Sequence, residues 1–231
     1  MTTVLLWDID GTLLTTKRAG VFALEEAARE VCGISPDFAQ LKTAGLTDHE
    51  VATLAIAETG TDPTPELASA FLRSYERHLP DRLHRRQGGP MPGVIAILDH
   101  FRGRPDVLSL LLTGNTRAGA AAKLDHYGLA HYFADGAFCL DGENRAQIAR
   151  RAFELATMHA PEPIEPESVI VIGDTPFDVR CGKEIGARTV AVATGAYELG
   201  ELGLEDPWLL LEALPEPSRF EALVLTGAHP G

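Results

Sequence analysis

Short apolar runs alternate with helical stretches from residue 94 onward, and this alternation constrains the fold more than any other feature of the sequence. The apolar runs have the length of buried strands and lie at residues 107–112, 168–172, 189–193 and 208–211, with a weaker one at 132–138. Helical patterns occupy residues 94–101, 117–127, 144–159 and 176–185. Alternating strands and helices are typical of a parallel, doubly wound sheet. We therefore expect an α/β fold.

An earlier apolar run, residues 4–7, ends abruptly in two carboxylates, Asp8 and Asp10. Side chains alternate along a strand, so both carboxylates would point to the same side if the extended conformation persists. Gly11 then lets the chain turn without a steric penalty. Two close carboxylates repel each other unless a divalent cation or a shared proton relieves the repulsion. Taken alone, the pattern also fits an ordinary turn, because Asp and Gly are common after strands.

The strand at residues 107–112 is followed by Thr113-Gly114-Asn115 and then by a helix. A hydroxyl group and exposed amides at a helix N-terminus bind phosphate well, and Gly114 permits a close approach of the backbone. Asn115 or Thr116 can instead serve only as the helix cap. The segment is therefore a candidate phosphate site with an equally good structural explanation.

The strand at residues 168–172 is followed by Asp174 and Asp178. Asp178 has capping-box spacing with Thr175, so a structural role is as good an explanation as a catalytic one. Asp174 has no capping role, and a metal ligand is the better explanation for it. Because parallel strands present their carboxyl ends at one edge of a sheet, we expect the polar groups after all three strands to converge.

Residues 17–89 interrupt the alternation with helical patterns alone. Within them, residues 47–50 (Thr-Asp-His-Glu) have capping-box spacing and open a helix. A loop rich in Gly and Pro at residues 88–93 ends the block. We expect an all-helical insertion at residues 17–89, with residues 1–16 and 90–231 forming one core domain.

Composition narrows the range of partners. The chain has 231 residues and a formal net charge of −13, which argues against nucleic acid because phosphate backbones attract basic surfaces. No apolar run approaches the length that spans a bilayer, and the run at residues 4–7 is too short for a signal peptide. We therefore expect no membrane partner and a cytoplasmic location. The three cysteines form no Cys-x-x-Cys pair, which indicates buried thiols. The sequence gives no indication of the oligomeric state, and we expect residues 229–231 to fray.

Together these motifs resemble, in order, those of the haloacid dehalogenase superfamily. The run Asp8-Ile-Asp10-Gly-Thr-Leu-Leu resembles the first motif of its phosphatase branch, Thr113 resembles the second, and residues 173–178 resemble the fourth. The resemblance covers nearly the whole chain and implies a Rossmann-like core. It also implies that the helical insertion is a cap domain of the phosphoglycolate phosphatase-like branch.

The resemblance further implies a Mg²⁺-dependent phosphatase that acts on a small phosphorylated metabolite. Asp8 would attack phosphorus and form an aspartyl-phosphate, and Asp10 would exchange protons with the leaving group and with water. Mg²⁺ would be held by Asp8, the backbone carbonyl of Asp10, and Asp174. Thr113 and Asn115 would stabilise the phosphoryl oxygens.

The third motif departs from the family pattern. The family usually has Lys near the start of the helix before the fourth-motif strand, and the basic residue here is Arg145. Arg145 can serve as a fixed cation, or it can be an exposed residue at a helix end; in the second case Lys123 is the next candidate. In the insertion, residues 45–48 resemble the specificity loop of the cap, which makes Thr47 and Asp48 candidate substrate contacts.

Three alternatives stay open. A dehalogenase of the superfamily needs no metal and generally lacks the second acid of the first motif, so Asp10 and Asp174 together count against it. A phosphosugar mutase has almost the same core, and nothing in the sequence firmly excludes it. A phosphate-binding regulator without turnover ranks last, because all the acids that turnover needs are present.

Overall fold

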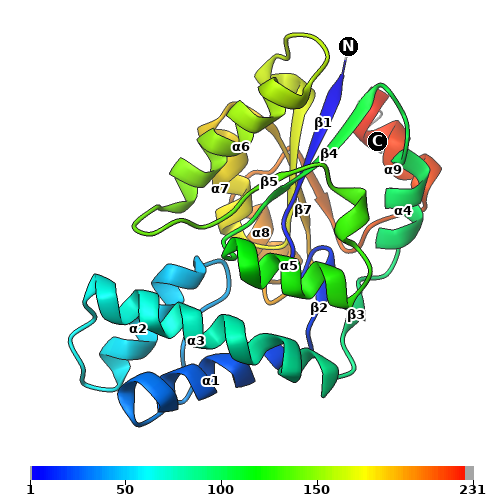
Figure 1. The fold of residues 1–231 in the computed structure, drawn as a ribbon. Helices are drawn as coiled ribbons and strands as arrows, with labels where there is room; N and C mark the ends of the chain where they lie inside the picture. Colours follow the sequence, from blue (N-terminus) through cyan, green and yellow to red (C-terminus); the bar gives the residue numbers. More distant parts are fainter. Residues whose placement is uncertain (1, 227–231) are drawn as a thin grey trace.

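The structure is a computed structural model that describes residues 2–226. Its centre is a parallel sheet with the strand order β5-β4-β1-β6-β7-β8 (Figure 1). The strands are β1 (Thr3–Trp7), β4 (Val107–Leu112), β5 (Gly136–Ala137), β6 (Val169–Gly173), β7 (Arg188–Val192) and β8 (Leu209–Leu211). Every neighbouring pair is parallel, which confirms the expected α/β fold with a doubly wound, Rossmann-like core.

Helices cover both faces of the sheet, as Figure 1 shows. One face carries α4 (Val94–Phe101), α5 (Arg117–His126) and α9 (Pro217–Thr226), and the other carries α6 (Arg145–His159) and α7 (Pro176–Glu184). A short helix, α8 (Leu199–Gly203), lies before β8. Side chains alternate along β1, so Leu5 and Trp7 join the first layer, while Val4 and Leu6 join the second. All four are fully buried, as expected for a strand covered on both faces.

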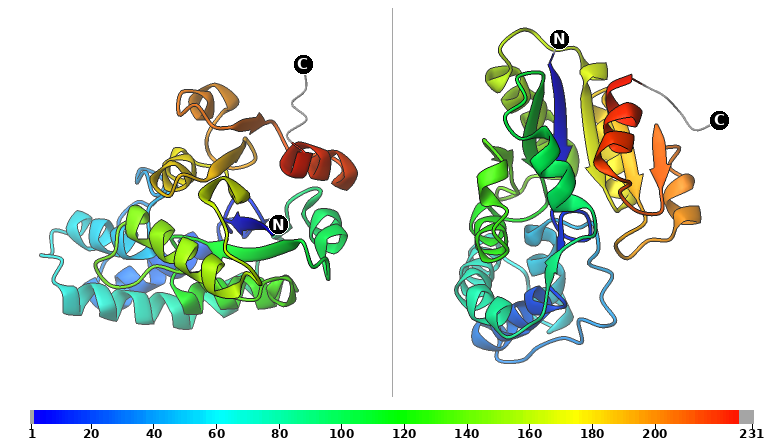
Figure 2. Two further views of the ribbon diagram at one scale, coloured as in Figure 1. Left: turned by 90° about the horizontal axis from the view of Figure 1, so that it is seen from above. Right: turned by 90° about the vertical axis from the view of Figure 1, so that its right-hand side faces the viewer.

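Three helices follow β1 in the sequence, before the chain returns to the sheet: α1 (Ala19–Cys32), α2 (Asp48–Glu58) and α3 (Pro65–His84). They share a hydrophobic cluster of their own, and Figure 2 shows them beyond one end of the sheet. Two short strands, β2 (Leu14–Thr15) and β3 (Gly89–Pro90), pair antiparallel where the chain leaves and re-enters the core. We call the segment between these strands, residues 16–88, the helical insert.

Local sequence signals explain where the helices of the insert begin. Thr47 makes a complete capping box with Glu50 at the start of α2. Thr64 accepts the N–H of Leu67 at the start of α3, with Pro65 at the first helical position. The two caps fix the loops between the helices, and the loop before α2 is the one that reaches the core.

Some details differ from the sequence-based expectation. The run at residues 132–138 is a strand only over β5, because it begins in a 3-10 turn (Ala130–Tyr132) and Asp135 binds the N–H of Gly136 locally. Cys139 and Cys181 are buried thiols as expected, whereas Cys32 is half-buried. The expectation for residues 229–231 lies outside the described residues. Among residues 2–226, no helix combines the length and apolarity that crossing a membrane requires.

Candidate active site

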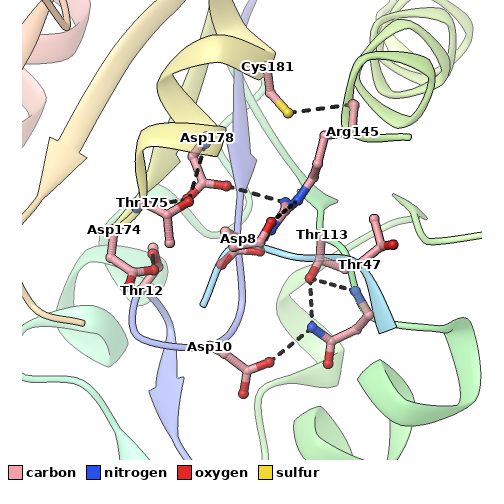
Figure 3. Close-up of polar contacts among 12 residues, drawn as sticks. Asp8, Asp10, Thr12, Thr47, Thr113, Arg145, Asp174, Thr175, Asp178 and Cys181 are labelled. Atoms are coloured by element: carbon pink, nitrogen blue, oxygen red, sulfur yellow. Dashed lines mark hydrogen bonds and ion pairs between the residues drawn. The ribbon is translucent and has the colours of Figure 1, made fainter. Parts of the chain in front are cut away.

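Polar side chains from three adjacent strands meet at one edge of the sheet, because β4, β1 and β6 are neighbours (Figure 3). Asp8 follows β1, Thr113 follows β4, and Asp174 follows β6. These are the strand ends for which the sequence predicts convergence. The convergence of these side chains therefore follows from the order of the strands.

Asp8 is buried, with 4% of its surface exposed. One carboxylate oxygen from each of Asp8, Asp174 and Asp178 lies within 4.8 Å of the others. Burial raises the pKa of Asp8 well above its ordinary value, and the charge of Asp178 adds to this effect, while Arg145 opposes it. Three buried carboxylates with so little compensating charge form a set that suits a hard divalent cation.

Asp174 is held by the loop that follows β1. Thr12 Oγ1 donates a hydrogen bond of 3.0 Å to Asp174 Oδ1. Gly11 has a φ of +85°, and a Cβ atom at this position would lie 2.4 Å from Asp174 Oδ2, so only glycine fits. Burial, followed by the charge of Asp178, raises the pKa of Asp174 to about 8. Burial and the neighbouring acids thus favour the protonated carboxyl of Asp174 in the metal-free protein.

Asp178 is oriented by hydrogen bonds at both carboxylate oxygens. Oδ2 accepts hydrogen bonds from Thr175 N at 3.0 Å and from Thr175 Oγ1 at 2.7 Å, which completes the predicted capping box of α7. Oδ1 accepts a hydrogen bond of 3.3 Å from Arg145 Nη1. These bonds give Asp178 a structural role beside the other two acids, since it holds both the helix start and Arg145.

Arg145 lies inside the site, although it is the first residue of α6. Only 11% of its side chain is exposed, and Nη1 lies 4.0 Å from Asp8 Oδ1. Its Nε donates a hydrogen bond of 2.9 Å to the carbonyl of Gly45 in the helical insert. The alternative of an exposed residue at a helix end is therefore wrong for Arg145. Its fixed cation stands between the nucleophile candidate and the insert.

Asp10 binds a different set of partners. Asp10 Oδ2 accepts hydrogen bonds from Lys123 Nζ at 2.5 Å and from Asn115 Nδ2 at 2.9 Å. Asp8 faces α6 and α7, whereas Asp10 faces α5, so the expectation that they point the same way is wrong. The extension ends at Trp7, and the chain then closes a tight turn in which Gly11 N donates to Leu14 O.

Lys123, which the sequence offers only as the second candidate for the cation, also lies in this cluster. It has 4% of its surface exposed, and its ammonium also donates a hydrogen bond of 2.5 Å to Asn115 Oδ1. Burial alone would lower the pKa of Lys123, but Asp10, Tyr75 and Asp48 together raise it above its ordinary value. A signal was present in the sequence: Lys123 shares a helical face with the buried residues Ala120 and Leu124.

Thr113 is fully buried, and its hydroxyl accepts hydrogen bonds from Asn115 N at 3.3 Å and from Asn115 Nδ2 at 3.0 Å. Thr116, not Asn115, caps α5, so the Asn115 side chain stays free to face the site. Gly114 is in close contact with the insert, because a Cβ atom there would lie 3.0 Å from the carbonyl oxygen of Leu46. The close approach that Gly114 permits in this structure is therefore made by the insert loop.

The loop before α2 fastens the insert to the core. Asp48 N donates to Gly114 O at 2.7 Å, and Thr116 N donates to Asp48 Oδ2, also at 2.7 Å. Thr47 is used in the capping box with Glu50 and is not among the residues that line the cavity. Asp48 therefore lines the cavity at the predicted site, whereas Thr47 does not.

The two parts of the chain enclose a cavity of about 310 Å³. The core contributes charged and polar residues to its lining: Asp8, Asp10, Asn115, Lys123, Arg145 and Asp174. The insert contributes mainly small or apolar residues, among them Val21, Leu24, Leu46 and Val51, together with Asp48 and Tyr75. A volume at the lower end of the range for ligand pockets suits a small molecule.

Comparison with known proteins gives the family. The family model of the haloacid dehalogenase-like hydrolases matches residues 5–183. A phosphoglycolate phosphatase of Synechococcus elongatus is 28% identical over 211 residues, which cover 89% of this chain and 91% of the relative.

Two solved structures share the fold. A protein of Clostridium acetobutylicum described as a predicted phosphatase has a TM-score of 0.74 and 17% identity, with 98% of this chain and 99% of that chain covered. A Thermotoga maritima protein provisionally assigned as a beta-phosphoglucomutase has a TM-score of 0.60 and 19% identity, with 99% and 100% covered. Because the family model covers most of the chain and the predicted motifs meet at one cavity, the chain belongs to the haloacid dehalogenase-like hydrolases.

Proposed function

We propose that the protein is a Mg²⁺-dependent phosphatase of the phosphoglycolate phosphatase-like type, which hydrolyses a small phosphorylated metabolite through an aspartyl-phosphate. The observation that carries the proposal is the position of Asp8. This acid follows the central strand, contributes to a cluster of buried carboxylates, and lies beside a fixed cation in the lining of the cavity between the core and the insert. The names of the relatives support the same reaction.

In the proposed first step, an Asp8 oxygen attacks phosphorus, and the bond from phosphorus to the leaving oxygen breaks. Asp10 gives its proton to that oxygen. In the second step Asp10 takes a proton from water, the water oxygen attacks phosphorus, and the carboxylate of Asp8 leaves. The hydrogen bonds from Lys123 and Asn115 both end on Asp10 Oδ2, so Oδ1 is the oxygen that remains for proton transfer.

The donor set fits Mg²⁺, because the clustered groups are carboxylate oxygens. Asp8, Asp174 and the backbone carbonyl of Asp10 would hold the ion, with Asp178 beside them. When bound, Mg²⁺ would offset the repulsion between Asp8 and the phosphoryl group. Thr12 supports this role by holding Asp174 in place through its hydrogen bond.

The cations of the core serve the phosphoryl group. Arg145 would stabilise negative charge on the phosphoryl oxygens, and the amide of Asn115 would help. Thr113 would act indirectly, because its hydroxyl accepts a hydrogen bond from the Asn115 side chain and so fixes the position of that side chain. The net charge of −13 would repel an anionic substrate, and these local positive charges would reverse that repulsion within the cavity.

We propose that residues 17–89 act as the cap domain and that residues 1–16 and 90–231 act as the catalytic core. The hydrogen bonds of Asp48 and Gly45 to the core support a closed arrangement that excludes water and contacts the leaving group. Thr47 would contribute only by capping α2.

The lining of the cavity favours a hydrolase over a phosphosugar mutase. A mutase must hold a second phosphoryl group, and this group needs cations of its own. Among residues 2–226, Lys123 and Arg145 are the only Lys or Arg side chains that line the cavity, and both already have acidic partners.

The experiment that tests the proposal compares wild-type protein with Asp8→Asn on a chromogenic phosphate ester, with and without Mg²⁺. We expect turnover only with the metal, and a loss on the order of 10⁴-fold or more in the variant, because no other group can form the covalent intermediate. A circular dichroism spectrum equal to that of the wild type serves as the folding control. Full activity of Asp8→Asn would refute the mechanism.

A further inference from the structure

The wall that the helical insert gives to the cavity has no cationic side chain among the described residues. This insert wall comprises Thr16, then Gly20, Val21 and Leu24 of α1, the loop residues 43–46, Asp48 and Val51 of α2, and Tyr75 of α3. Its only ionisable groups are Asp48, a carboxyl, and Tyr75, a phenol. The part of a substrate that points away from Asp8 meets this wall.

Lys123 cannot make up for the missing cation, because its ammonium is already committed to polar neighbours. It donates hydrogen bonds to Asp10 Oδ2 and Asn115 Oδ1, and its charge also interacts with Tyr75. The carboxyl of Asp48 also faces this ammonium. A second anionic group of the substrate that approached Lys123 would lie beside Asp10 and Asp48, whose charges this ammonium already offsets.

Arg145 is equally committed. It contacts Asp178 through Nη1 and the Gly45 carbonyl through Nε, and Nη1 also lies 4.0 Å from Asp8 Oδ1. The core wall thus supplies enough positive charge for one phosphoryl group. Among the described lining residues, no other Lys, Arg or His side chain is left for another anion.

We propose that the enzyme, although phosphoglycolate phosphatase-like in fold and mechanism, selects phosphate monoesters whose leaving group is small and uncharged. An aliphatic part of the leaving group would lie against the insert wall, and a hydroxyl group would meet Asp48 or Tyr75. This inference rests on the proposed function, because Asp8 fixes which end of the substrate faces the insert. A carboxylate against Val21, Leu24 and Val51 would lose water without gaining a cationic partner, and such burial is costly.

The test uses two esters that differ at one carbon: 2-phosphoglycolate, which ends in a carboxylate, and 2-hydroxyethyl phosphate, which ends in a hydroxymethyl group. We expect kcat/KM of the wild-type enzyme to favour the neutral ester by on the order of 10²-fold. The pair of 3-phosphoglycerate and glycerol 3-phosphate should show the same preference at greater length. Equal values, or a preference for the carboxylates, would overturn the inference.

A binding measurement separates this inference from the proposed mechanism. Calorimetric titration of Asp8→Asn with the same two esters in Mg²⁺ buffer reports selection without turnover, and tighter binding of 2-hydroxyethyl phosphate supports the inference. If phosphoglycolate binds tighter, and Lys123→Met removes that preference, then Lys123 receives the carboxylate and the inference is wrong. Release of phosphate by Asp8→Asn would instead contradict the proposed function, so the two failures are distinguishable.

A charge placed in the wall gives the converse test. Leu24 is half-buried on α1, so it tolerates a longer polar side chain. In Leu24→Lys the new ammonium can pair with the carboxylate of phosphoglycolate, whereas in Leu24→Gln that carboxylate stays unpaired. The ratio of kcat/KM for phosphoglycolate to kcat/KM for 2-hydroxyethyl phosphate should therefore be at least about tenfold higher in Leu24→Lys than in Leu24→Gln. An equal ratio in the two variants would show that the wall does not set the charge preference.

Discussion

The two walls of the cavity differ in charge and in origin. The core wall comes from the ends of β1, β4 and β6 and holds the acids and both cations, whereas the insert wall comes from three helices with a separate hydrophobic cluster. This difference separates chemistry from selection. Changes in the core wall should slow every substrate, and changes in the insert wall should alter the ratio between substrates.

The largest effect that sharpens this comparison is expected at Arg145. Arg145→Ala should lower kcat on the order of 10²–10³-fold for metabolite and chromogenic ester alike, because a fixed cation beside the phosphoryl group is lost. Arg145→Lys should recover part of the activity, since Lys cannot reproduce the planar fork. The stability also falls, because Asp178 Oδ1 loses its partner. Steady-state kinetics below the unfolding temperature provide the measurement.

The matched control for this prediction is Arg150→Ala. Arg150 lies on the same helix but is exposed, and it pairs with Glu184 at the surface. We expect nearly unchanged kinetics for this control. Equal kinetics for Arg145→Ala and Arg150→Ala would mean that Arg145 contributes only to folding.

A smaller effect is expected at Lys123, which links the two walls. Lys123→Met should lower kcat roughly 10–10²-fold, because Asp10 loses a donor that fixes its orientation. The decrease should be larger for esters with poor leaving groups, which need protonation most. The exposed Lys183 on α7 provides the control variant Lys183→Met. A decrease that is uniform across leaving groups would assign Lys123 to folding alone.

Displacement of the insert loop should have a weaker effect on the kinetics, because it changes only the insert wall. Gly45 has a φ of +83°, and a Cβ atom there would lie 2.3 Å from Phe177 Cδ2, so Gly45→Ala pushes the loop away from the core. We expect KM for the metabolite to rise on the order of tenfold with little change in kcat for the chromogenic ester.

The control for Gly45→Ala has the same backbone strain without the clash. Gly33 has a φ of +79° and nothing within 4 Å of the added atom. If Gly33→Ala raises KM as much as Gly45→Ala does, strain rather than loop position is responsible.

The smallest expected effect concerns metal binding and pH. The pKa of Asp174 is raised to about 8, so the metal-free protein holds a proton there that a cation must displace. The affinity for Mg²⁺ should therefore rise with pH, by about fivefold between pH 7 and pH 8, and binding should release a proton. Calorimetry in two buffers of different ionisation enthalpy measures this release. An affinity that does not change with pH would show that Asp174 is already ionised.

Local patterns were sufficient to predict the sheet and the convergence of its polar strand ends. Each apolar run and each cap is encoded within a few residues, and the parallel order then brings Asp8, Thr113 and Asp174 together. The limits are equally local. The run at residues 132–138 looks like a strand, but its length depends on pairing with β4, which the run itself does not specify.

The site was predictable where a residue directly follows a strand and less so where tertiary contacts decide. The partners of Asp10 depend on how the turn after Trp7 closes, and the role of Lys123 depends on which helix face meets the insert. Gly114 shows the same limit, because its close neighbour proved to be the insert loop. The charge difference between the walls likewise arises from residues far apart in the sequence.

The central claim is that the core wall performs the chemistry through a covalent intermediate on Asp8. Rapid acid quenching of the enzyme during turnover of phosphate-labelled ester, followed by tandem mass spectrometry of the peptide that contains residues 8–10, tests it directly. A covalent mechanism at Asp8 predicts a phosphoryl group on Asp8, none on Asp10, and none in Asp8→Asn. Undiminished turnover with no label on Asp8, or with the label on another residue, would contradict it.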